Sequence, residues 1–202
     1  SPVRDDRKLR PRADARAKQK GGIMEIKTNE KKFSTRTLTV TAMFLAMNII
    51  MSSSMLSVPV PGGHFYLNDI IICTAAILMD PLAAFMVGGV GAFLGDMIFY
   101  PLPMFVSLVT HGLQAVVISV FAHYVLKKKP VLASGIGVSL GAVIMVAGYT
   151  FGKAFIYGTP AAAIDKLPFE ILQAVVGAVA GMLLCWKCGV RKLYNKLCVK
   201  NS

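Results

Sequence analysis

Long apolar segments that carry almost no charge dominate this sequence from residue 37 onward. The segments at 82–100, 104–126, 131–157 and 169–186 each contain no more than one charged residue. A helix needs about 20 consecutive apolar residues to cross the roughly 30 Å hydrocarbon core of a bilayer. The sequence therefore predicts an all-α integral membrane protein.

Composition and charge distribution support this class. Hydrophobic residues make up 55% of the chain and charged residues 16%, and the mean hydropathy is +0.61. Soluble domains contain about 45–50% apolar and about 25% charged residues. Although the net charge is +12, twelve of the 22 Lys and Arg residues precede residue 37. A basic tail beside a bilayer explains this charge, so we expect a lipid bilayer and no nucleic acid as partner.

Six spans are predicted, within a membrane domain at 37–189. Pro81, Pro101 and Pro103 separate neighbouring apolar runs, because proline interrupts helices. The run at 69–79 is shorter than a full crossing, so five spans is the alternative. The expected loops are 58–67, which has two prolines and a Gly-Gly pair, and 158–168. The predicted spans are 37–57, 69–79, 82–100, 104–126, 131–157 and 169–186.

The basic residues predict the orientation. With six spans, twenty of the 22 Lys and Arg residues lie on the side that holds both termini. Basic flanks stay cytoplasmic, so residues 1–36 and 190–202 are predicted to be basic cytoplasmic tails. Residues 1–23 lack the apolar centre of a signal peptide, and Met24 opens a more ordinary start. We therefore expect residues 1–23 to be non-native or disordered.

Polar residues within the spans gather near their outer ends. An ionisable side chain facing lipid costs about 2.5–3.5 kcal/mol, so such groups usually face a bundle interior or a watery cavity. We expect a cup open to the outside. The alternative is a set of helix-end side chains that extend to the interface or pair, such as Asp96 with Lys153. The polar residues concerned are Asn68, Asp69, Asp96, His111, Gln114, Lys153, Glu170 and Gln173.

The sequence contains no phosphate loop of the GxxxxGK[ST] type and no convincing catalytic set. Cys185 and Cys188 have the spacing of two metal ligands, but only Cys198 is near enough in sequence to add another. We therefore expect no enzyme activity, no cofactor and no metal.

The apolar chain resembles a known family from Thr37 to Lys187. The most specific stretch is residues 62–117, which contains Phe65-Tyr-Leu-Asn-Asp69, Asp80-Pro81 and Phe93-Leu-Gly-Asp96; residues 148–158 and 167–177 add to the likeness. These elements are similar to the S components of energy-coupling factor (ECF) vitamin transporters. This sequence departs from the branch at two points. Asn68 precedes Asp69 where the branch usually has Gly before the Asp. The position of Lys153 is commonly acidic in the branch, and that of Glu170 commonly carries an amide-like residue.

The resemblance implies a substrate-binding subunit of an ABC importer in the bacterial plasma membrane. Its partners would be a membrane scaffold subunit and two cytoplasmic ATPases. Ala42 and Ala46 have a spacing that allows close helix packing, and the resemblance implies that they contact the scaffold. The loop at 58–67 would cover the ligand.

The candidate site combines aromatic side chains, which can cover a ring, with hydrogen-bonding groups. A ligand with protonatable nitrogens, such as pyridoxine or hydroxymethylpyrimidine, suits Asp69 and Asp96 and is slightly favoured. Pantothenate, an anion, would instead suit Lys153, and riboflavin is a third possibility. The alternative function is a stand-alone channel or secondary transporter, which would need polar residues through the inner half as well. The predicted substrate-binding residues are Phe65, Tyr66, Asn68, Asp69, Asp96, His111, Gln114, Tyr149, Lys153 and Gln173.

Overall fold

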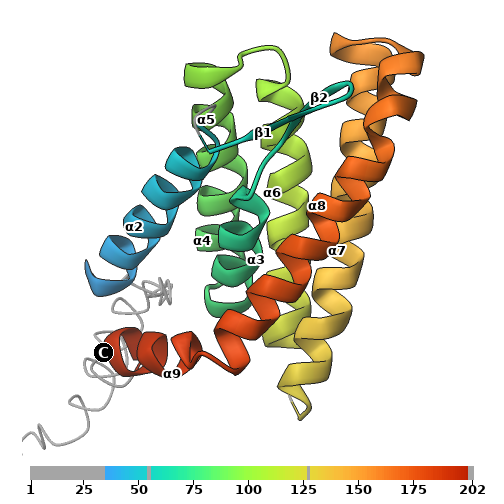
Figure 1. The fold of residues 1–202 in the computed structure, drawn as a ribbon. Coiled ribbons are helices and arrows are strands. Elements are labelled where there is room, and N and C mark those ends of the chain that lie inside the picture. Colours follow the sequence, from blue (N-terminus) through green and yellow to red (C-terminus); the bar gives the residue numbers. More distant parts are fainter. Residues whose placement is uncertain (1–34, 54–55, 127, 200–202) are drawn as a thin grey trace, which may run out of the picture. The chain divides into compact units, whose positions relative to one another are not determined.

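The structure is a computed structural model that describes residues 35–53, 56–126 and 128–199 (Figure 1). The predictions for residues 1–23 and for nearly all of the tail at 1–36 lie outside the described residues. Helices make up most of the described chain, as the apolar runs predicted.

Four helices in the described part of the chain are long and apolar enough to cross a membrane, and two shorter apolar helices accompany them. The expected count of six full spans is therefore not established. The long helices are Pro81–Phe99 (α4 Pro81–Phe85, η2 Met86–Val90, α5 Gly91–Phe99), Met104–Val125 (α6 Met104–Val120, η3 Phe121–Val125), Pro130–Tyr157 (α7 Pro130–Gly152, η4 Lys153–Tyr157) and α8 Pro160–Trp186. The shorter ones are α2 Thr35–Met51, which ends before the predicted Ser57, and α3 Asn68–Leu78.

Helix α8 corrects the predicted loop at 158–168. The helix begins at Pro160, nine residues before the expected start at Phe169. The Thr159 hydroxyl accepts a hydrogen bond from the Ala162 N–H (3.3 Å), and Pro160 occupies the first turn, where its missing N–H costs nothing. Pro168 lies inside α8 on its exposed side. Pro160, and not Pro168, therefore marks the start of this helix.

The segment at 58–67 contains a two-stranded hairpin. Strand β1 (Val58–Val60) pairs antiparallel with β2 (Gly63–Phe65). Gly62 adopts a left-handed φ of 77°, a conformation that residues with a side chain rarely adopt. A Cβ atom at Gly62 would also lie 2.8 Å from the Ala162 carbonyl oxygen and 3.0 Å from Lys166 Cβ. The hairpin turn therefore rests directly on the first turns of α8.

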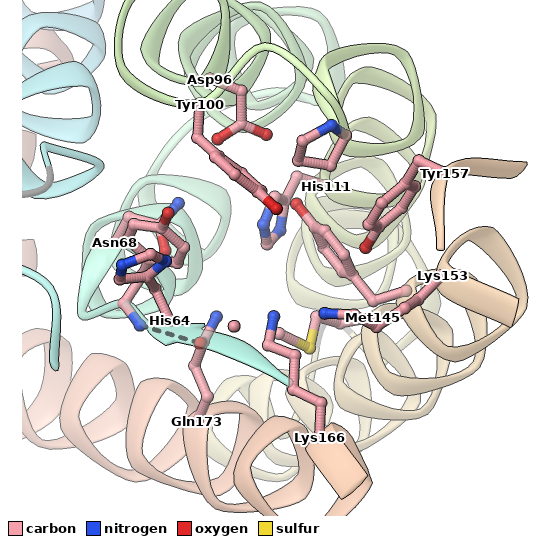
Figure 2. Close-up of a pocket in the computed structure, with 14 residues that line it drawn as sticks. His64, Asn68, Asp96, Tyr100, His111, Met145, Lys153, Tyr157, Lys166 and Gln173 are labelled. Carbon is pink, nitrogen blue, oxygen red and sulfur yellow. Dashed lines mark hydrogen bonds between the residues drawn. The ribbon is translucent and has the colours of Figure 1, made fainter. Parts of the chain in front are cut away.

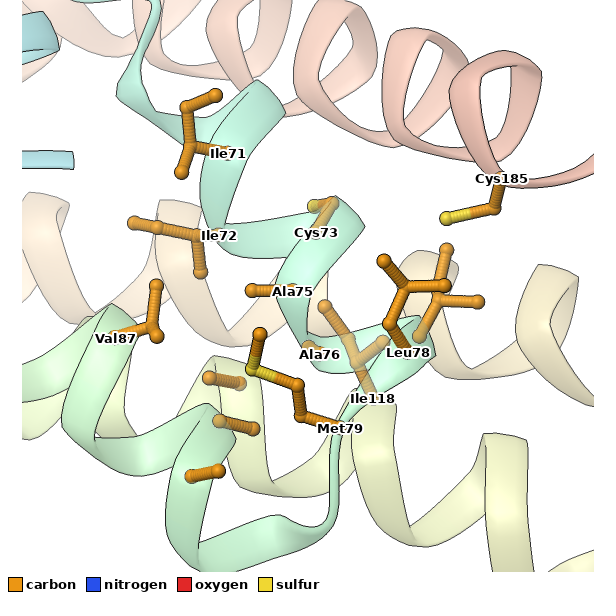
Figure 3. Close-up of a cluster of buried hydrophobic side chains, with 14 of the residues drawn as sticks. Ile71, Ile72, Cys73, Ala75, Ala76, Leu78, Met79, Val87, Ile118 and Cys185 are labelled. Carbon is orange, nitrogen blue, oxygen red and sulfur yellow. The ribbon is translucent and has the colours of Figure 1, made fainter. Parts of the chain in front are cut away.

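Helix α3 forms the centre of the bundle, and all of its residues except Ile70 are buried. It packs on α2, α6 and α8, and the apolar cluster around it includes Ile72, Met79 and Ile118 (Figure 3). Eleven residues of helix rise only about 16 Å, which is half of a bilayer core. The short predicted span is thus a buried helix surrounded by longer ones.

The chain after α8 turns at Gly189 (φ 78°) and forms α9 (Val190–Tyr194) and η5 (Asn195–Val199). Val190 and Tyr194 pack against the apolar cluster. In Figure 1, α9 lies across the end of the bundle that is farthest from the hairpin. Much of the predicted C-terminal tail is therefore helical and packed.

Candidate substrate-binding pocket

A polar cavity lies beneath the β1–β2 hairpin, where α3 and α8 begin and where α5 and η4 end (Figure 2). Its free volume is only about 30 Å³, room for one or two water molecules. Binding sites for small molecules are about ten times larger or more, so a vitamin-sized ligand requires lining side chains to move. The lining residues are Gly63, His64, Tyr66, Asn68, Asp96, Tyr100, Pro103, His111, Met145, Tyr149, Lys153, Tyr157, Lys166 and Gln173.

Seven of the ten predicted site residues line this cavity: Tyr66, Asn68, Asp96, His111, Tyr149, Lys153 and Gln173. Asp69 and Gln114 do not line it but are hydrogen-bonded to residues that do. Phe65 is not a lining residue, although His64 before it and Tyr66 after it both line the cavity.

Seven further lining residues were not predicted from the sequence: Gly63, His64, Tyr100, Pro103, Met145, Tyr157 and Lys166. Lys166 carried one usable signal, because it lies four residues before Glu170 and such a pair meets on one helix face. The expected loop at 158–168 hid that spacing. Lys153 and Tyr157 both belong to η4, whose wider π-turn presents the two side chains to the cavity.

The Asp69 carboxylate joins three helices below the cavity. Its Oδ1 accepts a hydrogen bond from Gln114 Nε2 on α6 (2.9 Å), and its Oδ2 accepts one from Gln173 Nε2 on α8 (2.6 Å). Gln114 Oε1 lies 2.7 Å from His111 Nδ1. Both Asp69 oxygens are therefore engaged with amides, and this acid is not a free group for a ligand.

Asp96 belongs to a second polar chain. The Ser107 hydroxyl donates to Asp96 Oδ2, and the Tyr149 hydroxyl lies 2.5 Å from the same Ser107 oxygen. The Tyr149 ring also contacts His111, with ring centroids 5.2 Å apart. Asp96 thus pairs with a neutral hydroxyl and not with Lys153, the alternative that the sequence left open.

Two buried lysines hold the opposite wall. Lys153 Nζ donates to the Gly62 carbonyl at the hairpin turn, and Lys166 Nζ lies 3.2 Å from Glu170 Oε1. Each ammonium also lies over a tyrosine ring: Lys153 over Tyr157 at 5.8 Å and Lys166 over Tyr149 at 5.6 Å. Lys166 therefore has a carboxylate partner, whereas Lys153 is held by a neutral carbonyl and an aromatic ring.

The hairpin is also attached through its C-terminal end. The Tyr66 backbone N–H donates to Gln173 Oε1 (3.0 Å). Burial, with a smaller contribution from the Asp96 charge, raises the pKa of the Tyr66 phenol to about 12. Tyr66 therefore presents a neutral hydroxyl at physiological pH.

Metal-ligating side chains are not grouped in the described part of the chain: no three His, Cys, Asp or Glu residues there are placed to hold one ion. Cys185 is buried and Cys188 exposed, and both are free thiols. The chemistry of the cavity is hydrogen bonding, ion pairing and aromatic contact.

Comparison with known proteins gives a family and two relatives. The model of the family described as "ECF-type riboflavin transporter, S component" matches residues 32–189. An "Uncharacterized protein in gap 3'region" of Pyrococcus woesei is 33% identical over 135 residues, which cover 66% of this chain and 88% of that protein. "Thiamine precursor transporter HmpT" of Lactococcus lactis subsp. cremoris (strain MG1363) is 28% identical over 153 residues, covering 74% of this chain and 85% of the relative.

The apolar helices define the class, a multi-pass membrane protein, and the polar cavity gives it a candidate binding site at one end of the bundle. The chain belongs to the ECF-type riboflavin transporter S component family, whose model matches most of its length. It is thus a vitamin-type substrate-binding subunit in the plasma membrane, a binding component of a transporter and not an enzyme.

Proposed function

We propose that this subunit captures a vitamin precursor with a pyridine or pyrimidine ring from outside and delivers it across the membrane with an ATP-driven module. The observation that carries the proposal is the polar cavity beneath the hairpin, which offers hydrogen-bond acceptors to such a ring. The likeness to a relative named as a thiamine precursor transporter supports the choice of ring.

Asn68 and Asp96 are the acceptors proposed to contact the ring. Asn68 is buried and donates to the Ser52 hydroxyl (3.3 Å), while its Oδ1 has no hydrogen-bond partner among the described residues. A buried acceptor without a hydrogen bond costs about 1–3 kcal/mol of stability. A hydrogen-bond donor on the ligand would remove this cost. An amino or ring N–H group between Asn68 and Asp96 supplies that donor.

The remaining predicted residues take distinct parts in this proposal. Tyr66 and Tyr149 cover the ring, Gln173, His111 and Lys153 add polar contacts, and Asp69 with Gln114 holds the helices below. Phe65 contributes through the hairpin that covers the site.

We further propose six membrane helices with both termini cytoplasmic, a membrane domain at 37–189 and basic tails at 1–36 and 190–202. The start of α7, the end of α8 and α9 lie toward the end of the bundle opposite the hairpin (Figure 1). Within or next to these segments the sequence has Lys128, Lys129, Lys187 and Arg191. Basic residues favour the cytoplasmic side, which supports an outward-facing cavity.

The partners in this proposal are a membrane scaffold subunit and two cytoplasmic ATPases. Ala42 and Ala46 are both exposed on α2, one turn apart, and Met43 and Met47 beside them are exposed too. Small residues on an exposed stripe let another helix approach closely. This stripe is the proposed scaffold contact.

Two measurements test the proposal. In calorimetry on the full chain in detergent, hydroxymethylpyrimidine or pyridoxine should bind more tightly than riboflavin or pantothenate. In liposomes, the chain alone should bind without transporting. ATP-independent uptake by the isolated chain would instead support the stand-alone channel or secondary transporter and overturn the subunit.

A further inference from the structure

The two lysines of the pocket converge on the hairpin turn. A Cβ atom at Gly63 would lie 3.1 Å from Lys153 Nζ and 3.4 Å from Lys166 Cδ, so the side chains of η4 and α8 reach the same point. Each lysine is only 7% exposed. In Figure 2 both ammonium groups point into the cavity from one wall.

The charges on this wall do not balance. Lys166 has the Glu170 carboxylate at 3.2 Å, whereas Lys153 donates to the neutral carbonyl of Gly62. Within the described residues no carboxylate comes within 4.0 Å of Lys153. A buried ammonium without a counter-charge is unfavourable, so this wall favours an anion.

Two further buried acids, Asp96 and Asp69, are engaged with other partners. Asp96 lies on the far side of the cavity in Figure 2 and accepts from Ser107. Asp69 is held by Gln114 and Gln173. The cavity therefore has cationic donors on the α7–α8 side and acceptors, Asp96 and Asn68 Oδ1, on the other.

We infer that the ligand carries an anionic arm, a carboxylate or phosphate, bound by Lys153 and Lys166 under the hairpin turn. This inference rests on the proposed function and names the substrate class of the same site, a donor-bearing ring with an anionic substituent. The anion replaces the Gly62 carbonyl as partner of Lys153, and a charged acceptor binds an ammonium more strongly than a neutral one. The ring then faces Asp96 and Asn68.

Matched ligand pairs test the anionic arm on the full chain in detergent. Calorimetry compares hydroxymethylpyrimidine with its monophosphate, pyridoxine with its 5'-phosphate, and pantothenate as a carboxylate without the ring. We expect at least one phosphorylated ring to bind ten-fold or more tightly than its neutral form. In Lys153→Met the preference for the phosphorylated ligand should fall at least ten-fold, whereas in Lys153→Arg it should persist. The control variant Lys128→Met, at the other end of the bundle, should keep the preference of the wild type.

The outcomes separate this inference from the proposed function. Equal affinity for both members of each pair, or a preference that survives Lys153→Met, overturns the anionic arm while the ring proposal stands. Lysine-dependent binding of pantothenate alone supports the anion site with a carboxylate and overturns the ring. Binding of none of the five compounds overturns both. Lys153→Arg distinguishes loss of charge from loss of folding.

Discussion

The Gln173 amide on α8 donates to the Asp69 carboxylate on α3 at 2.6 Å, although 104 residues separate them in the chain. A second amide, Gln114 on α6, occupies the other oxygen. One buried acid thus fixes the relative positions of three helices directly below the cavity.

Replacing that acid should destabilise the bundle. Asp69→Ala leaves the Gln114 and Gln173 amides without an acceptor, and we expect a loss of about 1–3 kcal/mol in the free energy of unfolding. Thermal unfolding in detergent measures the loss. Asp165→Ala, on the exposed surface of α8, is the control and should change stability by less than about 0.5 kcal/mol. Equal stability of the two variants would contradict a structural role for Asp69.

Close approach of α3 and α8 depends on glycine. A Cβ atom at Gly181 would lie 2.7 Å from Cys73 Cβ and 3.2 Å from the Thr74 nitrogen, so Gly181→Ala should cost about 1–3 kcal/mol. Gly135 on α7 has no atom within 4 Å of the same position, and Gly135→Ala should be neutral or stabilising by about 0.5–1 kcal/mol. Chemical unfolding of both variants checks this, and a stable Gly181→Ala protein would argue against the packing.

The start of α8 depends on its cap. Thr159→Ala removes the acceptor for the Ala162 N–H and should lower stability by about 0.5–2 kcal/mol, whereas Thr159→Ser keeps the hydroxyl and most of the stability. Hydrogen exchange of residues 162–166 locates the effect. Rapid exchange of this segment already in the unchanged protein would mean that the predicted loop at 158–168 was right.

Asp96 should matter for binding. Asp96→Asn removes the charge and one acceptor beside the proposed ring, and we expect affinity for hydroxymethylpyrimidine or pyridoxine to fall at least ten-fold, about 1.4 kcal/mol. Ser107→Ala keeps the acid but removes its hydroxyl partner, and should have a smaller effect. Calorimetry with Asp165→Asn as control measures both, and an unchanged Kd in Asp96→Asn would place that acid outside the binding site.

The exposed stripe on α2 should matter for uptake alone. Ala42→Leu or Ala46→Leu adds bulk where a scaffold helix is proposed to pack, so cellular uptake should be lost while binding in detergent stays at wild-type affinity. Ala147→Leu adds the same bulk to an exposed position of α7 and should leave both unchanged. Normal uptake in both α2 variants would remove the docking proposal.

Much of the fold follows from apolar runs bounded by proline. The helices at 68–78 and 81–99 lie within one residue of their predicted limits, because Pro81 and Pro101 interrupt the apolar chain on either side. The same rule failed at Pro168, which an exposed position inside α8 tolerates. Proline indicates where a hydrogen bond is missing, and only the surroundings decide whether the helix ends there.

The site was predictable where a polar residue interrupts an apolar span, as Asp96 and Lys153 do. Lys166 was missed because a lysine in a presumed loop is expected to face water. The contact between Lys153 and Gly62 joins residues 91 positions apart, and no local spacing indicates it. A contact between residues so far apart in sequence depends on how the hairpin lies over the bundle.

The hairpin is fastened to the bundle by Lys153 and Gln173, two side chains that also line the cavity. A ligand that enters the cavity therefore competes with the hairpin for the Lys153 ammonium and the Gln173 amide. The accessibility of the turn to a protease or a chemical label becomes a reporter of occupancy. An occupied site and an empty one are then distinguishable by cleavage or labelling at the turn, without detection of the ligand.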